Sequence, residues 1–165
     1  GVNVPMRKSL LIQSFWLKNS MRVLLTTILL YLPSHLAAEM EFFSIAENAV
    51  VMYDAPSLKA DKLYVASRYL PVEVVVDVEG WAKVRDSSGS LAWVEKKVLN
   101  QQRYVVVTVP LANIHQSADI NSELVFQAEE NIVMEWIDSD VKGWVKVRHL
   151  DGQTGYVKVN QVWGS

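Results

Sequence analysis

The 165-residue sequence contains no cysteine, so neither disulfide bonds nor thiolate metal ligands are available to it. It also has no acidic residue before Glu39, although four of its 16 basic residues lie in that part. The part after Ala38 therefore has 12 basic and 18 acidic residues, a formal net charge of −6. This balance argues against binding to a nucleic acid backbone, which requires clustered lysine and arginine, and against docking on anionic lipids.

The N-terminal part has no apolar run long enough to cross a membrane. The run from Val23 to Leu32 has ten residues, about 15 Å as a helix against a hydrocarbon core of about 30 Å. Arg22 precedes this run and Pro33 and small residues follow it, which is the pattern of a cleavable signal sequence. We expect residues 1–38 to be an N-terminal extension and signal peptide, cut after Ala38, and the protein to be periplasmic or secreted. An uncleaved leader is the alternative, and it would supply the protein's membrane contact.

The sequence also lacks any group of residues with the pattern of a metal or catalytic site. His115 and His149 are the only histidines after the leader, and neither has a His, Asp or Glu partner at metal-ligand spacing. The serines lie in turn-like segments without an adjacent base, and nothing resembles a nucleophile elbow or a phosphate-binding loop. We therefore expect no metal and no enzyme, and a small cell-wall hydrolase is the less favoured alternative.

One segment of the sequence occurs twice. Residues 79–86 read EGWAKVRD, and residues 142–149, 63 positions later, read KGWVKVRH. At the same offset, Tyr156 in the second copy corresponds to Trp93 in the first. A period near 60 with short alternating strands predicts two copies of one small β unit, which we place at residues 39–100 and 101–165. Because a unit of this size is marginal alone and the linker is short, we expect the two units to pack on each other.

Alternation along the strands predicts which side chains are buried. Ala82 and Val84 form a core face, so Trp81 lies on the opposite face among charged neighbours. In the strand that starts at Pro71, we expect Val72, Val74 and Val76 to share one face. Each unit then has about five short strands, and closing them into a small, partly open barrel avoids exposed edges.

The remaining strands of the two units are matched through smaller offsets. Residues 112–116 correspond to residues 51–55 at an offset of 61, and Leu124 corresponds to Leu63 at the same offset. In the polar segment 59–68 and just after it, we expect three side chains to point inwards: Leu63, Val65 and Tyr69. Growing offsets place single-residue insertions in loops, where insertions are tolerated.

Residues 80–85 and 89–94, supported by 70–74 and 162–164, resemble bacterial SH3-like domains. The resemblance covers Glu39 to Gly164 and is to tandem domains of secreted proteobacterial proteins of unknown function. It implies an all-β fold of two tandem SH3-like small β-barrels after an N-terminal signal helix. It also implies an extracytoplasmic location, no cofactor and a binding role, because many bacterial SH3-like domains are thought to hold peptidoglycan or peptide.

The eukaryotic relatives bind proline-rich peptides in a groove of aromatic residues. Tyr53-Asp54 resembles the first motif of that groove, and Trp81 and Trp144 lie where its tryptophan would be. The family's proline is replaced by Glu95 and Lys158, and the second unit has Ile114-His115 in place of Tyr-Asp, so both units depart from the pattern for proline-rich peptides. The candidate ligand-binding residues are Tyr53, Asp54, Trp81, Trp93, Trp144 and Tyr156.

These residues have structural alternatives as well. Trp81 and Trp144 would pack the end of a barrel or the contact between repeats, and Asp54 would stabilise an ordinary turn. As a function we expect a non-catalytic binding or scaffold module of the bacterial envelope, which recognises peptidoglycan or a peptide or protein partner through surface aromatics. The alternative is a ligand-binding sensor or accessory subunit with a cleft between the two units, lined by Trp136, Trp144 or Tyr104. We expect no nucleic acid among the partners.

Overall fold

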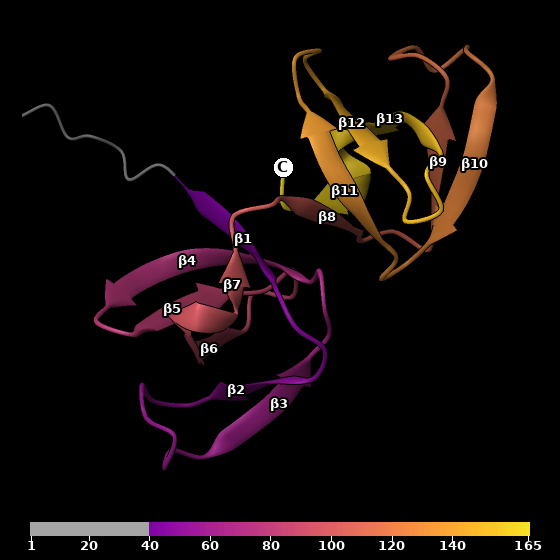
Figure 1. Ribbon diagram of the computed structural model, residues 1–165. Helices are drawn as coiled ribbons and strands as arrows, with labels where there is room; N and C mark the ends of the chain where they lie inside the picture. Colours follow the sequence, from indigo (N-terminus) through magenta and orange to yellow (C-terminus); the bar gives the residue numbers. More distant parts are fainter. Residues whose placement is uncertain (1–39) are drawn as a thin grey trace, which may run out of the picture. The chain divides into compact units, whose positions relative to one another are not determined.

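The structure is a computed structural model that describes residues 40–165; the predicted signal peptide and its helix lie outside these residues. Met40–Ser165 forms one compact unit. It is all-β, with 14 strands in two antiparallel sheets and two single-turn 3₁₀ helices (Figure 1). Within residues 40–165 no helix has the length and apolar character needed to cross a membrane.

The first sheet has seven strands in the order β3-β2-β6-β5-β4-β1-β7. In chain order they are β1 (Glu41–Ile45), β2 (Val50–Tyr53), β3 (Lys62–Ala66), β4 (Pro71–Val78), β5 (Trp81–Arg85), β6 (Leu91–Glu95) and β7 (Leu99–Asn100). The 3₁₀ helix η1 (Lys96–Val98) joins β6 to β7.

The second sheet repeats this plan in the order β10-β9-β13-β12-β11-β8-β14. Its strands are β8 (Tyr104–Val107), β9 (Leu111–His115), β10 (Leu124–Glu129), β11 (Val133–Asp138), β12 (Trp144–Arg148), β13 (Thr154–Lys158) and β14 (Val162–Trp163), with the 3₁₀ helix η2 (Val159–Gln161) before β14. Each strand has its counterpart at the same place in the other sheet. The predicted duplication of one β unit is therefore confirmed.

The sheets differ from the predicted barrels in strand number and in closure. Each has seven strands rather than five, because the entry strand β1 pairs with both β4 and β7, and β8 likewise pairs with β11 and β14. In the part of the chain that the structure describes, no ladder joins the edge strands β3 and β7, or β10 and β14. Neither sheet is thus a closed barrel by its hydrogen bonds.

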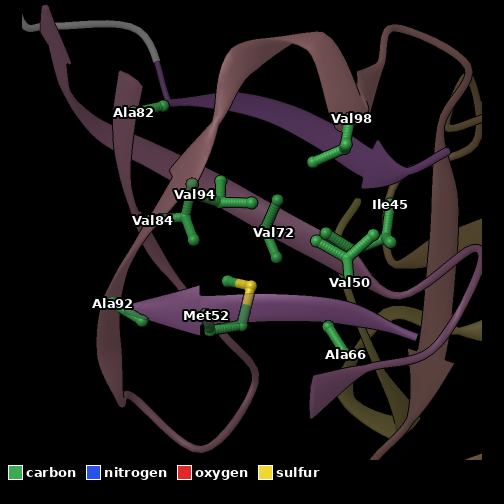
Figure 2. Close-up of a cluster of buried hydrophobic side chains, with 10 residues drawn as sticks. All are labelled: Ile45, Val50, Met52, Ala66, Val72, Ala82, Val84, Ala92, Val94 and Val98. Carbon is green, nitrogen blue, oxygen red and sulfur yellow. The ribbon is translucent and has the colours of Figure 1, made fainter. Parts of the chain in front are cut away.

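Each sheet has its own hydrophobic core. Figure 2 shows the ten buried side chains of the first core: Ile45, Val50, Met52, Ala66, Val72, Ala82, Val84, Ala92, Val94 and Val98. Ala82 and Val84 are at most 1% exposed, which confirms the core face predicted for this strand. Fully burying a valine-sized side chain contributes about 1.5–3 kcal/mol, so a small core of this kind holds one sheet together.

The inward residues predicted for β3 are wrong by one position. Leu63 and Val65 are 50% and 60% exposed, whereas Ala66 is buried and Tyr64 is half-buried against the core. The ladder pairs Ala66 with Val50 and Tyr64 with Met52, both of which face the core. Successive side chains of a strand alternate between its two faces. An error of one residue therefore places every side chain of the strand on the wrong face.

A β-bulge interrupts the face predicted for β4. Val72 is fully buried and Val74 packs against the core, but Val76 is 41% exposed. The pairing of β4 with β5 shifts between Val74 and Val76. A bulge adds one unpaired residue to the strand. Beyond it, the side chains that alternation would place on the core face therefore point to the opposite face.

Candidate functional site

Three aromatic side chains meet on the outer face of the first sheet. Trp81 on β5 and Trp93 on β6 alternate with core residues, and Tyr53 at the end of β2 pairs with Trp93 across the ladder. The ring of Tyr53 lies edge-on to the indole of Trp81, with centroids 5.6 Å apart and planes inclined by 82°. We call these three residues, with Lys83 and Glu95 beside them, the first platform.

The second sheet carries the same arrangement at the same place. His115 at the end of β9 pairs with Tyr156 on β13, and its imidazole lies edge-on to the indole of Trp144, with centroids 5.6 Å apart and planes inclined by 89°. Lys146 and Lys158 lie beside these aromatic residues on β12 and β13. We call these five residues the second platform.

His115 is the site residue that sequence reasoning missed. The offset of 61 matched Tyr53 with Ile114, but Ile114 is fully buried and stands in the place of Met52, while His115 stands in the place of Tyr53. The offset in these strands is therefore 62. Alternation could have revealed this, because Ala112 and Ile114 mark a core face and leave His115 on the outer one.

The platform residues lie outside the two hydrophobic core clusters, and they differ in how far they are buried. Tyr53 and His115 are 8% and 7% exposed, whereas Trp81, Trp93, Trp144 and Tyr156 are half-buried. The Nδ1 atom of His115 lies 3.1 Å from the carbonyl oxygen of Ser122, which fixes the orientation of the imidazole. Each platform thus has one anchored ring at its edge and two larger rings that keep part of their surface accessible.

The residues beside the rings give the two platforms different charges. Glu95 stands directly opposite Trp81 in the first ladder, and Lys158 stands directly opposite Trp144 in the second. The Nζ atom of Lys158 lies 5.9 Å from the ring centroid of Trp144, within the range of a cation–π interaction. The Nζ atom of Lys146 lies 5.8 Å from the ring of Tyr156.

A small pocket adjoins the first platform. It has a volume of about 260 Å³ and is lined by Glu47, Ala49, Val50, Val51, Tyr53, Glu95, Lys97 and Val98. This is slightly smaller than a pocket for a drug-sized ligand, so it suits a single side chain or a group of similar size. Glu95 is already engaged there, since its carboxylate lies 3.3 Å from Nζ of Lys97.

Asp54 has a structural task in the turn after β2. Its Oδ1 atom accepts a hydrogen bond of 3.0 Å from the backbone N–H of Asp61, and its own N–H donates to the carbonyl of Asp61. These two bonds close the loop between β2 and β3. Asp54 therefore holds the segment that ends in Tyr53, which is the turn role considered as its alternative.

The aromatic residues expected in a cleft between the units are engaged in packing. Tyr104 is 6% exposed and stacks on Tyr69 with ring centroids 4.6 Å apart, and burial raises the pKa of Tyr104. The guanidinium of Arg103 lies 4.3 Å above the ring of Trp136, and burial lowers the pKa of Arg103. The indole N–H of Trp136 donates to Ser139. These contacts count against a ligand cleft built from Trp136 and Tyr104.

The second histidine of residues 40–165, His149, lies at the turn between β12 and β13. His149 contacts the carboxylate of Asp151 at 3.0 Å, and a backbone hydrogen bond from Gln153 lowers the pKa of Asp151. Among residues 40–165 no group of three or more His, Asp or Glu side chains is placed to hold a metal ion.

Two family models, each described as a bacterial SH3 domain, match residues 46–101 and residues 110–161, together more than half of the chain. The chain belongs to the bacterial SH3 domain family. The prediction of two such domains in tandem is confirmed. The first bacterial SH3 domain carries the first platform and the second carries the second, so the platforms are equivalent sites of one family fold.

Solved structures similar to this tandem SH3 chain come from larger proteins. NlpC2 from Trichomonas vaginalis shares 18% identity over 76% of this chain and 48% of that one, with a TM-score of 0.36. NlpC1 from the same organism shares 18% over 76% and 46%, also at 0.36. An NlpC/P60 family protein from Bacillus cereus ATCC 10987 shares 17% over 73% and 55%, at 0.34. The chain spans about half the length of these proteins, and similarities this weak have no bearing on the site. A comparison with curated proteins gave no match.

Proposed function

We propose that this protein is a non-catalytic binding module of the bacterial cell envelope, which holds peptidoglycan through its two aromatic platforms. The observation that carries the proposal is the recurrence of the platform. An edge-on ring pair with centroids 5.6 Å apart stands on the outer face of both sheets, although one pair is Tyr53–Trp81 and the other His115–Trp144. The two ring pairs have the same separation, although the first domain has a tyrosine where the second has a histidine.

Recurring outer-face aromatics suit a binding role. A half-buried indole offers a large apolar surface together with an N–H donor, and aromatic residues of this kind supply most of the energy at many interfaces. The side chains around the rings are lysine and glutamate, which orient a polar ligand by charge. Stacking and charge recognise sugars and short peptides, which are the components of peptidoglycan.

The proposed location follows from the N-terminal sequence. The charged residue, the ten-residue apolar run and the break at Pro33 favour export and cleavage after Ala38. Export would bring both domains to the cell wall, where their family's binding role is expected. The acidic balance of the part after Ala38 favours a ligand other than an anionic lipid or a nucleic acid.

Retention on purified, insoluble peptidoglycan tests the proposal. We expect the exported protein to sediment with the wall material, Trp81→Ala and Trp144→Ala each to reduce the bound fraction several-fold, and the double variant to reduce it further. Leu58→Ala is the matched control, because Leu58 is 63% exposed and belongs to neither platform. Circular dichroism checks that each variant folds. Absence of sedimentation by the wild type, or full retention of the folded double variant, would contradict the proposal.

A further inference from the structure

The two platforms differ in charge at one matched position. In the ladder of β5 with β6, Trp81 pairs with Glu95 and Lys83 pairs with Trp93. In the ladder of β12 with β13, Trp144 pairs with Lys158 and Lys146 pairs with Tyr156. Each set forms a square with aromatic residues at one pair of opposite corners and charged residues at the other. The charges cancel in the first square and add to +2 in the second.

This difference is local to the platforms. Residues 39–100 contain seven basic and ten acidic residues, and residues 101–165 contain five and eight, so each repeat has a formal net charge of −3. The second domain is thus no more basic than the first. Its positive charge is concentrated at the corners of the aromatic square.

The two lysines of the second platform are available to a ligand. In the first domain the neighbouring lysines are engaged, Lys96 with Asp77 and Lys97 with Glu95. None of the ion pairs found among residues 40–165 involves Lys146 or Lys158, and each of these ammonium groups lies over an aromatic ring. A cation–π contact at a half-exposed site is worth only about 0.5–1 kcal/mol, so a carboxylate can replace or join it.

We propose that the second platform selects a peptide with a free carboxylate group and that the first platform does not. This inference rests on the proposed function, and it names the group of the wall peptide that the second domain recognises. The carboxylate would lie between Lys146 and Lys158, which are diagonal neighbours about 7–8 Å apart at their backbones. The apolar part of the peptide would lie against the indole of Trp144.

The charge of the whole domain favours a single carboxylate over a polyanion. At physiological salt, charges are screened beyond about 8 Å. A compact carboxylate therefore responds mainly to the two nearby ammonium groups. A long anionic polymer also passes over the surrounding surface, which is net negative in each repeat.

The test compares two forms of one peptide on the full chain, purified after export. The probes are acetyl-alanyl-alanine with a free carboxylate and the same peptide with a C-terminal amide, titrated while the indole N–H signal of Trp144 is followed by NMR. We expect the carboxylate form to bind about tenfold more tightly, because a hydrogen bond to a charged group is worth about 1.5–3 kcal/mol. Lys158→Glu, which copies the first platform, should abolish this preference.

Two further variants complete the test. Glu95→Lys should give the first platform a carboxylate preference, seen at the indole signal of Trp81. Lys59→Glu is the control for net charge, because Lys59 is exposed in a loop, and it should leave the preference unchanged. Equal binding of the two peptides, a preference that survives Lys158→Glu, or tighter binding of inorganic polyphosphate would overturn the inference.

The inference and the proposed function fail in different ways. If the protein sediments with peptidoglycan but binds both peptides equally, the function stands and the carboxylate inference is wrong. If the carboxylate preference is found but no form sediments with the wall, the inference stands and the ligand belongs to another envelope peptide.

Discussion

The imidazole of His115 lies edge-on to the indole of Trp144 with their ring centroids 5.6 Å apart. The ring pair Tyr53–Trp81 has the same separation in the first domain. Two different residues therefore fill one place in the fold. The contact joins strands that are far apart in the chain, and it ties the end of β9 to the start of β12.

The equivalence of the two rings predicts that His115→Tyr is tolerated. We expect this variant to keep the free energy of unfolding within about 1 kcal/mol, because the first domain shows that tyrosine fits. His115→Ala should cost about 2–3 kcal/mol, since it removes the edge contact with Trp144 and the contact with the Ser122 carbonyl. Urea denaturation measures both. Equal stability of the alanine and tyrosine variants would show that the ring contact does not matter.

The close approach of Gly155 to β9 gives a second prediction. A Cβ atom at this position would clash with Cγ2 of Ile114 and would lie 2.8 Å from the backbone oxygen of His115. We expect Gly155→Ala to destabilise the protein by about 1–3 kcal/mol through overpacking. Thermal unfolding of the variant measures this loss.

The first domain suggests a second substitution that should restore stability to the Gly155→Ala variant. It has Met52 in the place of Ile114 and Ala92 in the place of Gly155, and both are buried there. Methionine is unbranched at Cβ, so Ile114→Met should relieve the clash and recover part of the stability lost in Gly155→Ala. If the double variant is no more stable than Gly155→Ala, the clash with the backbone oxygen dominates.

The repeated cross-strand ion pair gives a third prediction. Arg85 donates to Glu73 at 3.1 Å, and Arg148 donates to Glu135 at the same distance, but the side chain of Glu73 is 10% exposed and that of Glu135 is 28% exposed. Glu73→Gln should cost about 1–2 kcal/mol and Glu135→Gln less than about 1 kcal/mol, because a pair that water reaches contributes little. Chemical denaturation at low and high salt measures both losses, and equal losses would contradict the role of burial.

The pair Tyr64–Asp86 predicts a loss of stability at high pH. Burial, followed by the neighbouring carboxylate of Asp86, raises the pKa of Tyr64 from 10.0 to about 12. The folded state then holds the proton more tightly than the unfolded state, so this contribution is complete below pH 10 and is lost as the pH rises from 10 to 12. The measurement is thermal unfolding across this range.

Tyr64→Phe is the matched variant, because Phe126 occupies the equivalent place in the second domain and packs against that core. We expect its stability to fall less steeply above pH 10 than that of the wild type. Tyr104, whose pKa burial also raises, accounts for part of the remaining slope. Identical slopes for the two proteins would show that Tyr64 titrates normally.

The duplication, the all-β class and the core face of β5 could be predicted from the sequence alone. The repeated segments at residues 79–86 and 142–149 stand in register, and the alternation of Ala82 and Val84 with charged residues is a local property. Local patterns of this kind hold as long as the strand is regular. For the same reason Trp81 and Trp144 could be placed on the outer face.

The contacts between side chains of different strands could not be predicted from the sequence. The shift at Val74–Val76 and the true phase of β3 depend on bulges and ladder pairing between distant segments, and the sequence pattern does not show them. The same holds for the edge-on contact of His115 with Trp144, which a one-residue error in the offset had hidden. The physical reason is that side chains of a strand alternate with a period of two, so a single inserted residue moves every later side chain to the other face.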